Sequence, residues 1–292
     1  MITITPLHPV FAAGMTGVDL RTPPDADLVR RIDDAMNQYA VLAVRDQQLD
    51  DDQQLAFAKA MGPLETTRGV VDGHKHRLKY EEMIDISNLD IDDSIMREDD
   101  RRRMFNLGNH LWHSDSSFKP TPAKYSMLHA RIIPPEGGNT EFADMRAAWD
   151  ALPEATQRLI EPLVCDHSLL YSRAMLGFDE FTEQERMAFE PVPQRLVRRH
   201  AGSGRRSIYL AEHIGTIHGW KRPEALAFIR DLTEHATQRE FVYSHVWQPH
   251  DLVIWDNRCT MHRARPFDDR RYQRDMRRMT LEDSAPTLEQ PV

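Results

Sequence analysis

Residues 240–267, EFVYSHVWQPHDLVIWDNRCTMHRARPF, contain the pattern that decides the fold. Three segments rich in aromatic and β-branched side chains, 240–247, 252–258 and 259–267, follow one another here, with the turn QPHD after the first. Short segments of this composition, bounded by turn residues, are typical of β-strands. A series of such strands predicts a β-sandwich or β-barrel.

Segments upstream extend this pattern and add helices. Apolar runs at 40–45 and 124–133 predict two further strands. Leu28, Ile32 and Met36 lie four residues apart, which is the period of a helix. The predicted helices are 26–39, 51–61, 145–160 and 222–237. These elements together predict a mainly β fold with flanking helices.

We expect residues 1–292 to form a single domain, because no Gly/Ser-rich or Pro-rich linker divides the chain. The stretch 66–106 is polar, charged and without periodicity. Loops of this length are uncommon unless they serve a function. We therefore predict that 66–106 is a surface insertion that closes over a pocket as a lid.

The composition excludes several classes of partner. The 292 residues carry 37 basic and 46 acidic side chains, a net charge of −9, which argues against nucleic acid or an anionic membrane surface. No apolar run reaches the roughly 20 residues of a membrane span, and the N-terminus lacks the basic segment of a signal peptide. Two cysteines cannot build a disulfide framework, so we expect a cytoplasmic protein. The sequence leaves the oligomeric state open, and a homo-oligomer is one option.

One pair of residues has the spacing of metal ligands. His113-Ser114-Asp115 is the only His-x-Asp in the chain, and residues two apart on a strand point to the same side. A distal histidine, best placed at His262, would complete a set of two histidines and one carboxylate. Such a set holds ferrous iron on one face and leaves positions open for substrate and oxygen. Zinc with a hydrolytic water remains an alternative.

Three segments resemble a known family: WHSDSSF at 112–118, PPEGGNTEF at 134–142 and WDNRCTMHRA at 255–264. They are similar to the taurine/2,4-dichlorophenoxyacetate family of Fe(II)- and 2-oxoglutarate-dependent dioxygenases. Within it the chain most resembles the members that act on 2,4-dichlorophenoxyacetate, over nearly its whole length. The resemblance implies a double-stranded β-helix (jelly-roll) core, with His113 and Asp115 binding iron together with His262.

The resemblance also assigns the residues that hold the two acids of the reaction. It implies that Thr140 and Arg274 bind the carboxylates of 2-oxoglutarate. An arginine suits this role because its planar fork pairs with a carboxylate through two hydrogen bonds. Arg278 then binds the acidic group of the substrate. Neighbouring arginines leave these last two assignments open to a shift: Arg270, Arg271 and Arg277.

Further residues match the family's substrate pocket. His200 and His213 correspond to histidines near the substrate's carboxylate and ether oxygen, and Asn109 corresponds to a residue of the pocket floor. Thr216 stands where the relatives of this type have a histidine, and His218 is displaced to one side. This departure leaves the exact substrate open.

The reaction implied by the resemblance consumes O2 and 2-oxoglutarate. It hydroxylates the carbon next to the ether oxygen of an aryloxyalkanoate such as 2,4-dichlorophenoxyacetate (2,4-D), a small anionic aromatic molecule. The products are a phenol and glyoxylate, with succinate and CO2. The alternatives are a dioxygenase of the same family for a sulfonate such as taurine or for an alkyl sulfate, and a jelly-roll protein that binds a metal without oxygenase chemistry.

Overall fold

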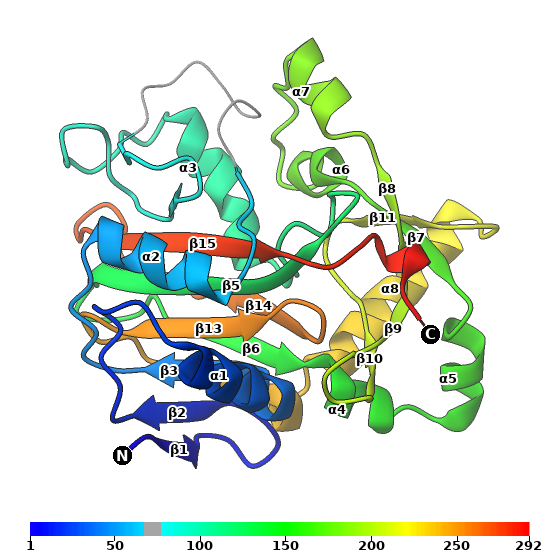
Figure 1. The fold of residues 1–292 in the computed structure, drawn as a ribbon. Coiled ribbons are helices and arrows are strands. Elements are labelled where there is room, and N and C mark those ends of the chain that lie inside the picture. Colours follow the sequence, from blue (N-terminus) through cyan, green and yellow to red (C-terminus); the bar gives the residue numbers. More distant parts are fainter. Residues whose placement is uncertain (67–76, 292) are drawn as a thin grey trace.

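The computed structural model describes residues 1–66 and 77–291, a strand-rich fold with helices packed around it (Figure 1). The strands are β1 (Thr3–Pro6), β2 (Ala13–Thr16), β3 (Val41–Val44), β4 (Ile84–Asp85), β5 (Ala123–Ile132), β6 (Thr140–Asp144), β7 (Val164–His167), β8 (Val192–Arg195), β9 (Val197–Arg199), β10 (Arg206–Ile208), β11 (Ile214–Ile217), β12 (Val242–His245), β13 (Leu252–Asp256), β14 (Thr260–Ala264) and β15 (Asp275–Glu282). The α-helices are α1 (Ala26–Tyr39), α2 (Asp51–Met61), α3 (Arg101–Asn106), α4 (Met145–Asp150), α5 (Glu154–Ile160), α6 (Leu169–Ala174), α7 (Glu183–Ala188) and α8 (Arg222–Ala236). The 3-10 helices are η1 (Leu107–His110), η2 (Arg239–Phe241) and η3 (Thr287–Glu289).

The main sheet has seven strands in the order β1-β2-β3-β13-β5-β15-β4. Strands β2 and β3 run parallel, and the other neighbouring pairs run antiparallel. The C-terminal strands β13 and β15 lie on either side of β5, so the end of the chain completes the centre of the sheet. This arrangement brings the middle and the end of the sequence together.

Successive side chains along these strands point to opposite faces of the sheet, and each face packs in its own apolar core. Helices α1 and α2 cover one face, where Leu42 and Ile254 are fully buried among the side chains of both helices (Figure 1). The opposite face carries Val253 and Trp255, which pack with Phe142 of β6. Strand β6 is the centre of a second sheet, β12-β6-β14. The two sheets therefore face each other across an apolar layer.

A third part of the fold lies at one end of the two sheets. Strands β11, β7 and β8 form a small sheet, and β9 and β10 form a hairpin. Helices α4 and α8 pack on them around a core that includes Leu210 and Ile229. In Figure 1 this part carries α6 and α7 on its upper side.

Most of the predicted elements are confirmed, with one correction. Helices 26–39 and 51–61 match α1 and α2, which Asp25 and Asp50 cap at their N-termini through side-chain hydrogen bonds. The single helix predicted at 145–160 is wrong, because the structure has two helices, α4 and α5, over this range. Pro153 separates them, since proline lacks the N–H that a continuous helix would need.

The predicted loop 66–106 falls partly outside the described residues, which omit 67–76. The described part contains β4 and α3 and is tied to the main sheet. Arg77, at its start, pairs with Asp85 at 2.8 Å and with Asp275 of β15 at 2.8 Å. The lid and the single domain stay predictions. Among the described residues, no helix combines the length and the apolar character that crossing a membrane requires.

Candidate functional site

The structure brings His113, Asp115 and His262 together. His113 and His262 form an isolated β-bridge, in which each backbone N–H donates to the other residue's carbonyl, at 3.0 and 2.8 Å. Nε2 of His113 lies 3.8 Å from Oδ1 of Asp115, and Nε2 of His262 lies 3.6 Å from Oδ2. All three side chains are buried. One ligand atom from each residue falls within 4.8 Å of the others, so a single metal ion can be shared.

Both imidazoles present a nitrogen to the same point. Nδ1 of His113 donates a hydrogen bond to the carbonyl oxygen of Leu111 at 2.8 Å, which leaves its Nε2 free to accept a metal. Burial lowers the pKa of His113 and lowers that of His262 well below its ordinary value. Neutral imidazoles are the form that coordinates a metal.

A polar network fixes the carboxylate of Asp115. Ser126 donates a hydrogen bond to Oδ2 at 2.7 Å, and Asn257 accepts one from the backbone N–H of Asp115 at 3.0 Å. The Asn257 amide in turn donates to Ser126 at 2.9 Å and accepts from the indole N–H of Trp255 at 3.1 Å. Such second contacts orient a metal ligand and preserve its geometry.

Arg278 gives Asp115 its charge partner. Its guanidinium donates to Oδ1 of the carboxylate. Burial would raise the pKa of Asp115, but the charge of Arg278 is the largest opposing cause and holds the pKa below its ordinary range. The carboxylate is therefore ionised, as a metal ligand must be.

The expected strand around His113 is wrong in detail. Only the bridge to His262 is regular here, and Asp115 begins a turn in which Ser116 has a φ of 52°. The two side chains still converge, because the segment is extended from Leu111 to His113 before the chain turns. Spacing alone could not distinguish this bridge from a full strand.

A pocket that opens to solvent lies against the two histidines. Four other site residues expected from the sequence also line this pocket: Asn109, Thr140, Arg274 and Arg278. The walls between them are apolar and include Ile86, Leu128 and Phe267. The pocket therefore has room for small molecules with both acidic and apolar parts.

Arg274 is a buried cation without a protein counter-charge. Its side chain is 7% exposed, and no carboxylate within residues 1–66 and 77–291 lies within 4.0 Å of its guanidinium. Its backbone N–H donates to Asn88, which places the side chain at the pocket. Burial lowers its pKa to about 10, so the group stays charged at neutral pH. An unpaired buried guanidinium requires an anionic ligand for compensation.

Thr140 is oriented toward the same pocket. Its hydroxyl oxygen accepts a hydrogen bond from the indole N–H of Trp247 at 3.0 Å. The hydroxyl proton is then available to a ligand, because the oxygen already has its donor. Trp247 was not predicted from the sequence, where its signal is its place at the end of an apolar segment.

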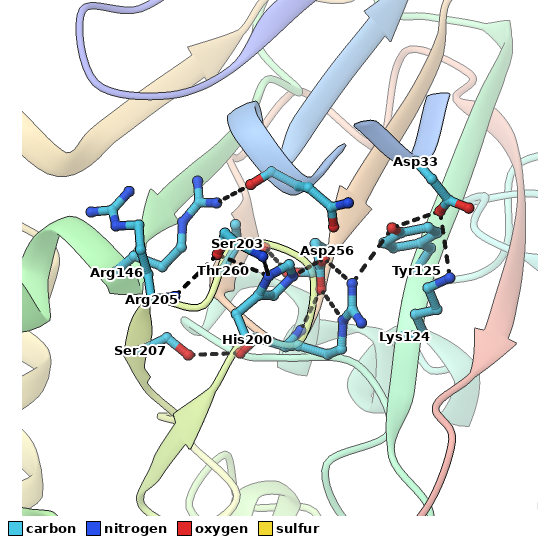
Figure 2. Close-up of polar contacts among 12 residues, drawn as sticks. Asp33, Lys124, Tyr125, Arg146, His200, Ser203, Arg205, Ser207, Asp256 and Thr260 are labelled. Atoms are coloured by element: carbon cyan, nitrogen blue, oxygen red, sulfur yellow. Dashed lines mark hydrogen bonds and ion pairs between the residues drawn. The ribbon is translucent and has the colours of Figure 1, made fainter. Parts of the chain in front are cut away.

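The two predicted pocket histidines occupy different places. His213 is buried beside the metal site, with its ring centroid 6.5 Å from that of His113 and Nδ1 2.9 Å from Oγ of Ser172. The predicted position of His200 in the substrate pocket is corrected, because the structure does not bring His200 to this pocket. Figure 2 shows its ring directed at Asp256, with Nε2 2.8 Å from Oδ2.

His200 belongs to a structural network that is buried at His200, Asp256 and Tyr125. The guanidinium of Arg258 donates two hydrogen bonds to Asp256, at 2.9 and 2.6 Å, and lies over the ring of Tyr125. Tyr125 donates to Asp33 of α1 at 2.9 Å. This network joins the β9–β10 hairpin to β13, β5 and α1.

Comparison with known proteins places this site in a family. Residues 3–280 match the family described as taurine catabolism dioxygenase TauD, TfdA family, and the chain belongs to it. The resemblance inferred from the three motifs is thus confirmed.

Individual members of the family are similar over nearly the whole chain. The α-ketoglutarate-dependent 2,4-dichlorophenoxyacetate dioxygenase of Cupriavidus pinatubonensis is 46% identical, over 97% of this chain and 99% of its own. The (S)-phenoxypropionate/α-ketoglutarate dioxygenase of Sphingobium herbicidovorans is 38% identical, over 91% and 90%. The crystal structure of AAD-2 in complex with Mn(II) and N-oxalylglycine has a TM-score of 0.90 and 49% identity, covering 99% of this chain and 100% of that one.

Proposed function

We propose that the chain is an Fe(II)- and 2-oxoglutarate-dependent dioxygenase that hydroxylates an aryloxyalkanoate at the carbon next to the ether oxygen. The observation that carries this proposal is the buried Arg274, which has no carboxylate partner among the described residues and lies in a pocket lined also by His113 and His262. A protein that only binds a metal has no use for a buried cation without a partner. An enzyme that binds a dicarboxylate beside the metal requires one.

The residues present fit a ferrous ion. Two neutral imidazoles and one carboxylate, His113, His262 and Asp115, converge on one point and leave the pocket side open. This donor set with open positions is typical of non-haem Fe(II) oxygenases. When bound, Fe(II) couples the oxidative decarboxylation of 2-oxoglutarate to the insertion of one oxygen atom into the substrate.

The protein's own residues bind and orient the cosubstrate. Arg274 pairs with the distal carboxylate of 2-oxoglutarate, and the Thr140 hydroxyl donates a hydrogen bond to it. Arg278 holds Asp115 in its ionised form, and the Asn257–Ser126 pair keeps the carboxylate turned toward the two histidines. Positioning and charge compensation are thus supplied before any ligand enters.

The substrate class follows from the relatives and from the pocket. The curated relatives named above carry 2,4-dichlorophenoxyacetate or phenoxypropionate in their names. Ile86, Leu128 and Phe267 offer an aryl ring an apolar wall, and arginines near the metal offer its carboxylate a counter-charge. Hydroxylation next to the ether oxygen gives a hemiacetal, which breaks its C–O bond to release a phenol and, from an aryloxyacetate, glyoxylate.

A substrate panel tests this function. Purified protein is given Fe(II), 2-oxoglutarate and O2 with 2,4-D, phenoxypropionate, taurine or an alkyl sulfate, and succinate is measured with phenol release. We expect succinate and phenol in equal amounts with an aryloxyalkanoate. Turnover with taurine or the alkyl sulfate alone would show instead that the enzyme is a dioxygenase for sulfonates or alkyl sulfates. If no compound leads to succinate, the proposal that the chain is a 2-oxoglutarate-dependent oxygenase is refuted.

The remaining expectations are also proposals. We propose that the two facing sheets form the double-stranded β-helix implied by the resemblance. The free, buried thiols of Cys165 and Cys259 are compatible with a reducing cytoplasm. A homo-oligomer and the lack of a nucleic-acid partner stay predictions.

A further inference from the structure

The proposed function gives the Thr140 hydroxyl a carboxylate of 2-oxoglutarate to bind, and this requires the hydroxyl to point in one direction. Thr140 lines the pocket and is 3% exposed. A hydroxyl rotates to suit its surroundings, and it has only one proton to donate. Within residues 1–66 and 77–291 the Thr140 hydroxyl donates to no protein acceptor, so this proton is unused in the free protein. The affinity for an acid therefore depends on what fixes the orientation of the hydroxyl.

Trp247 is the residue that contacts this hydroxyl. Its indole N–H donates to Oγ1 of Thr140 at 3.0 Å. An indole nitrogen donates and does not accept, so the hydroxyl proton cannot be spent on Trp247 in return. Trp247 is 6% exposed and is not among the residues that line the pocket. It can therefore act on a ligand in the pocket only through Thr140.

The turn that carries Trp247 is held by one buried carboxylate, that of Asp251, which is 1% exposed. Its Oδ2 accepts hydrogen bonds from Nε2 of His245 at 3.0 Å and from the backbone N–H of Gln248 at 2.8 Å. The guanidinium of Arg45, directly after β3, pairs with the same oxygen. These contacts fix the connection between β12 and β13 on both sides of Trp247.

His245 also contacts the indole directly. Its ring packs edge-on against that of Trp247, with the ring centroids 4.7 Å apart and an interplanar angle of 81°. Nδ1 of His245 lies 3.1 Å from the hydroxyl of Tyr243, so both nitrogens of the imidazole have partners. In the antiparallel pairing of β12 with β6, His245 lies opposite Thr140. The indole is therefore fixed against the same strand pair that carries Thr140.

We propose that Trp247 is a positioning residue for 2-oxoglutarate, because its indole N–H keeps the Thr140 hydroxyl turned toward the pocket. The turn held by Asp251 keeps the indole in place. Hydrogen bonds in a chain polarise one another, so a hydroxyl that accepts from the indole also donates more strongly to a carboxylate. This inference rests on the proposed function and deepens it, since it adds a determinant of cosubstrate affinity that lies outside the pocket.

Trp247→Phe tests this role, because phenylalanine keeps an aromatic ring and removes the N–H. Loss of this hydrogen bond should lower the affinity for 2-oxoglutarate by about 3- to 10-fold. The affinity is measured by calorimetry with the anaerobic protein loaded with Fe(II). In turnover the KM for 2-oxoglutarate should rise by a similar factor, whereas kcat and the KM for 2,4-D should change by less than about twofold.

A double-mutant cycle with Thr140→Val separates positioning from a general structural role. If Trp247 acts through the Thr140 hydroxyl, its replacement has no further effect once this hydroxyl is absent. In the Thr140→Val background, Trp247→Phe should therefore change the affinity for 2-oxoglutarate by less than about twofold. A loss by the same factor in both backgrounds would show that Trp247 acts independently of Thr140, and it would overturn the inference.

Trp149→Phe is the matched control. Trp149 of α4 is 7% exposed, packs in the core that includes Leu210 and Ile229, and does not line the pocket. The same substitution at this position should keep the wild-type affinity for 2-oxoglutarate. If Trp247→Phe does not fold, 3-benzothienylalanine at position 247 replaces it, because this side chain has the shape of tryptophan with sulfur in place of the N–H.

The outcomes for this inference and for the proposed function are distinct. A folded variant without the N–H that binds 2-oxoglutarate as tightly as wild type would show that Trp247 has no positioning role. If wild type binds 2-oxoglutarate but turns over no compound, the proposed function fails, and the binding cycle still decides the role of Trp247. If wild type does not bind 2-oxoglutarate, the proposed function and this inference fail together.

Discussion

Replacement of Arg274 by glutamine should separate stability from function, because the two effects have opposite signs. In the free protein the buried guanidinium has no carboxylate partner within the described ranges, and burial lowers its pKa to about 10. At about 1.4 kcal/mol for each pKa unit, keeping this charge buried costs the folded state about 3 kcal/mol. Removal of the charge should therefore raise the free energy of unfolding by about 1–3 kcal/mol, since glutamine still has polar groups to satisfy.

The substitution Arg274→Gln should also weaken the binding of 2-oxoglutarate. Two charge-assisted hydrogen bonds to the distal carboxylate of 2-oxoglutarate are lost, and the affinity should fall by about 30- to 1000-fold. Urea unfolding of the metal-free protein measures the first effect. The visible absorption band that forms when 2-oxoglutarate chelates Fe(II) without oxygen measures the second.

Arg265→Gln is the control for Arg274→Gln. Arg265 lines the same pocket, but it is exposed and lies 3.8 Å from Glu141, so its replacement should leave both measurements nearly unchanged. The reasoning fails if Arg274→Gln destabilises the free protein and keeps its affinity for 2-oxoglutarate within about threefold of wild type.

Four other outcomes follow from the structure. Asn257→Ala removes the support of Asp115 and should weaken Fe(II) binding by about 10- to 100-fold in a metal titration, and unchanged affinity would contradict the role of the network. Thr140→Val should raise the KM for 2-oxoglutarate by about 5- to 20-fold with an unchanged KM for the substrate, and the reverse pattern would refute its orientation. Asp256→Asn leaves Arg258 with a neutral partner and should destabilise the protein by about 3–5 kcal/mol in urea unfolding, whereas a loss below about 1 kcal/mol would show that the network is dispensable. The carboxyl of Asp275 has a pKa lowered to about 2, because hydrogen bonds from Arg77 and Arg277 outweigh the effect of burial. The ionised carboxylate therefore stabilises the fold above about pH 4, and this stabilisation is lost as the pH falls toward 2. Asp275→Asn should flatten this part of the curve of urea midpoint against pH.

The sequence was informative where chemistry depends on local spacing. His113 and Asp115 are two residues apart, and the period of an extended chain already places them on one side. Helix α1 follows from the four-residue spacing of Leu28, Ile32 and Met36. These features require only neighbouring residues.

Features that depend on tertiary contacts could not be predicted in this way. The pairing of Arg278 with Asp115 joins β15 to a turn far away in the sequence. The sequence alone therefore could not show that Arg278 contacts this carboxylate. His200 belongs to a buried network with Asp256, and a motif match could not show which partner it meets.

The bridge between His113 and His262 also determines when the metal site can exist during synthesis. Two of the three ligands, His113 and Asp115, precede the middle of the chain. The third, His262, comes from its last part, as do Arg274 and Arg278. A nascent chain that ends before β14 has His113 and Asp115 side by side and nothing to complete them. Iron can therefore be captured only after the ribosome has released nearly the whole polypeptide, and a fragment cut before residue 262 cannot compete for it.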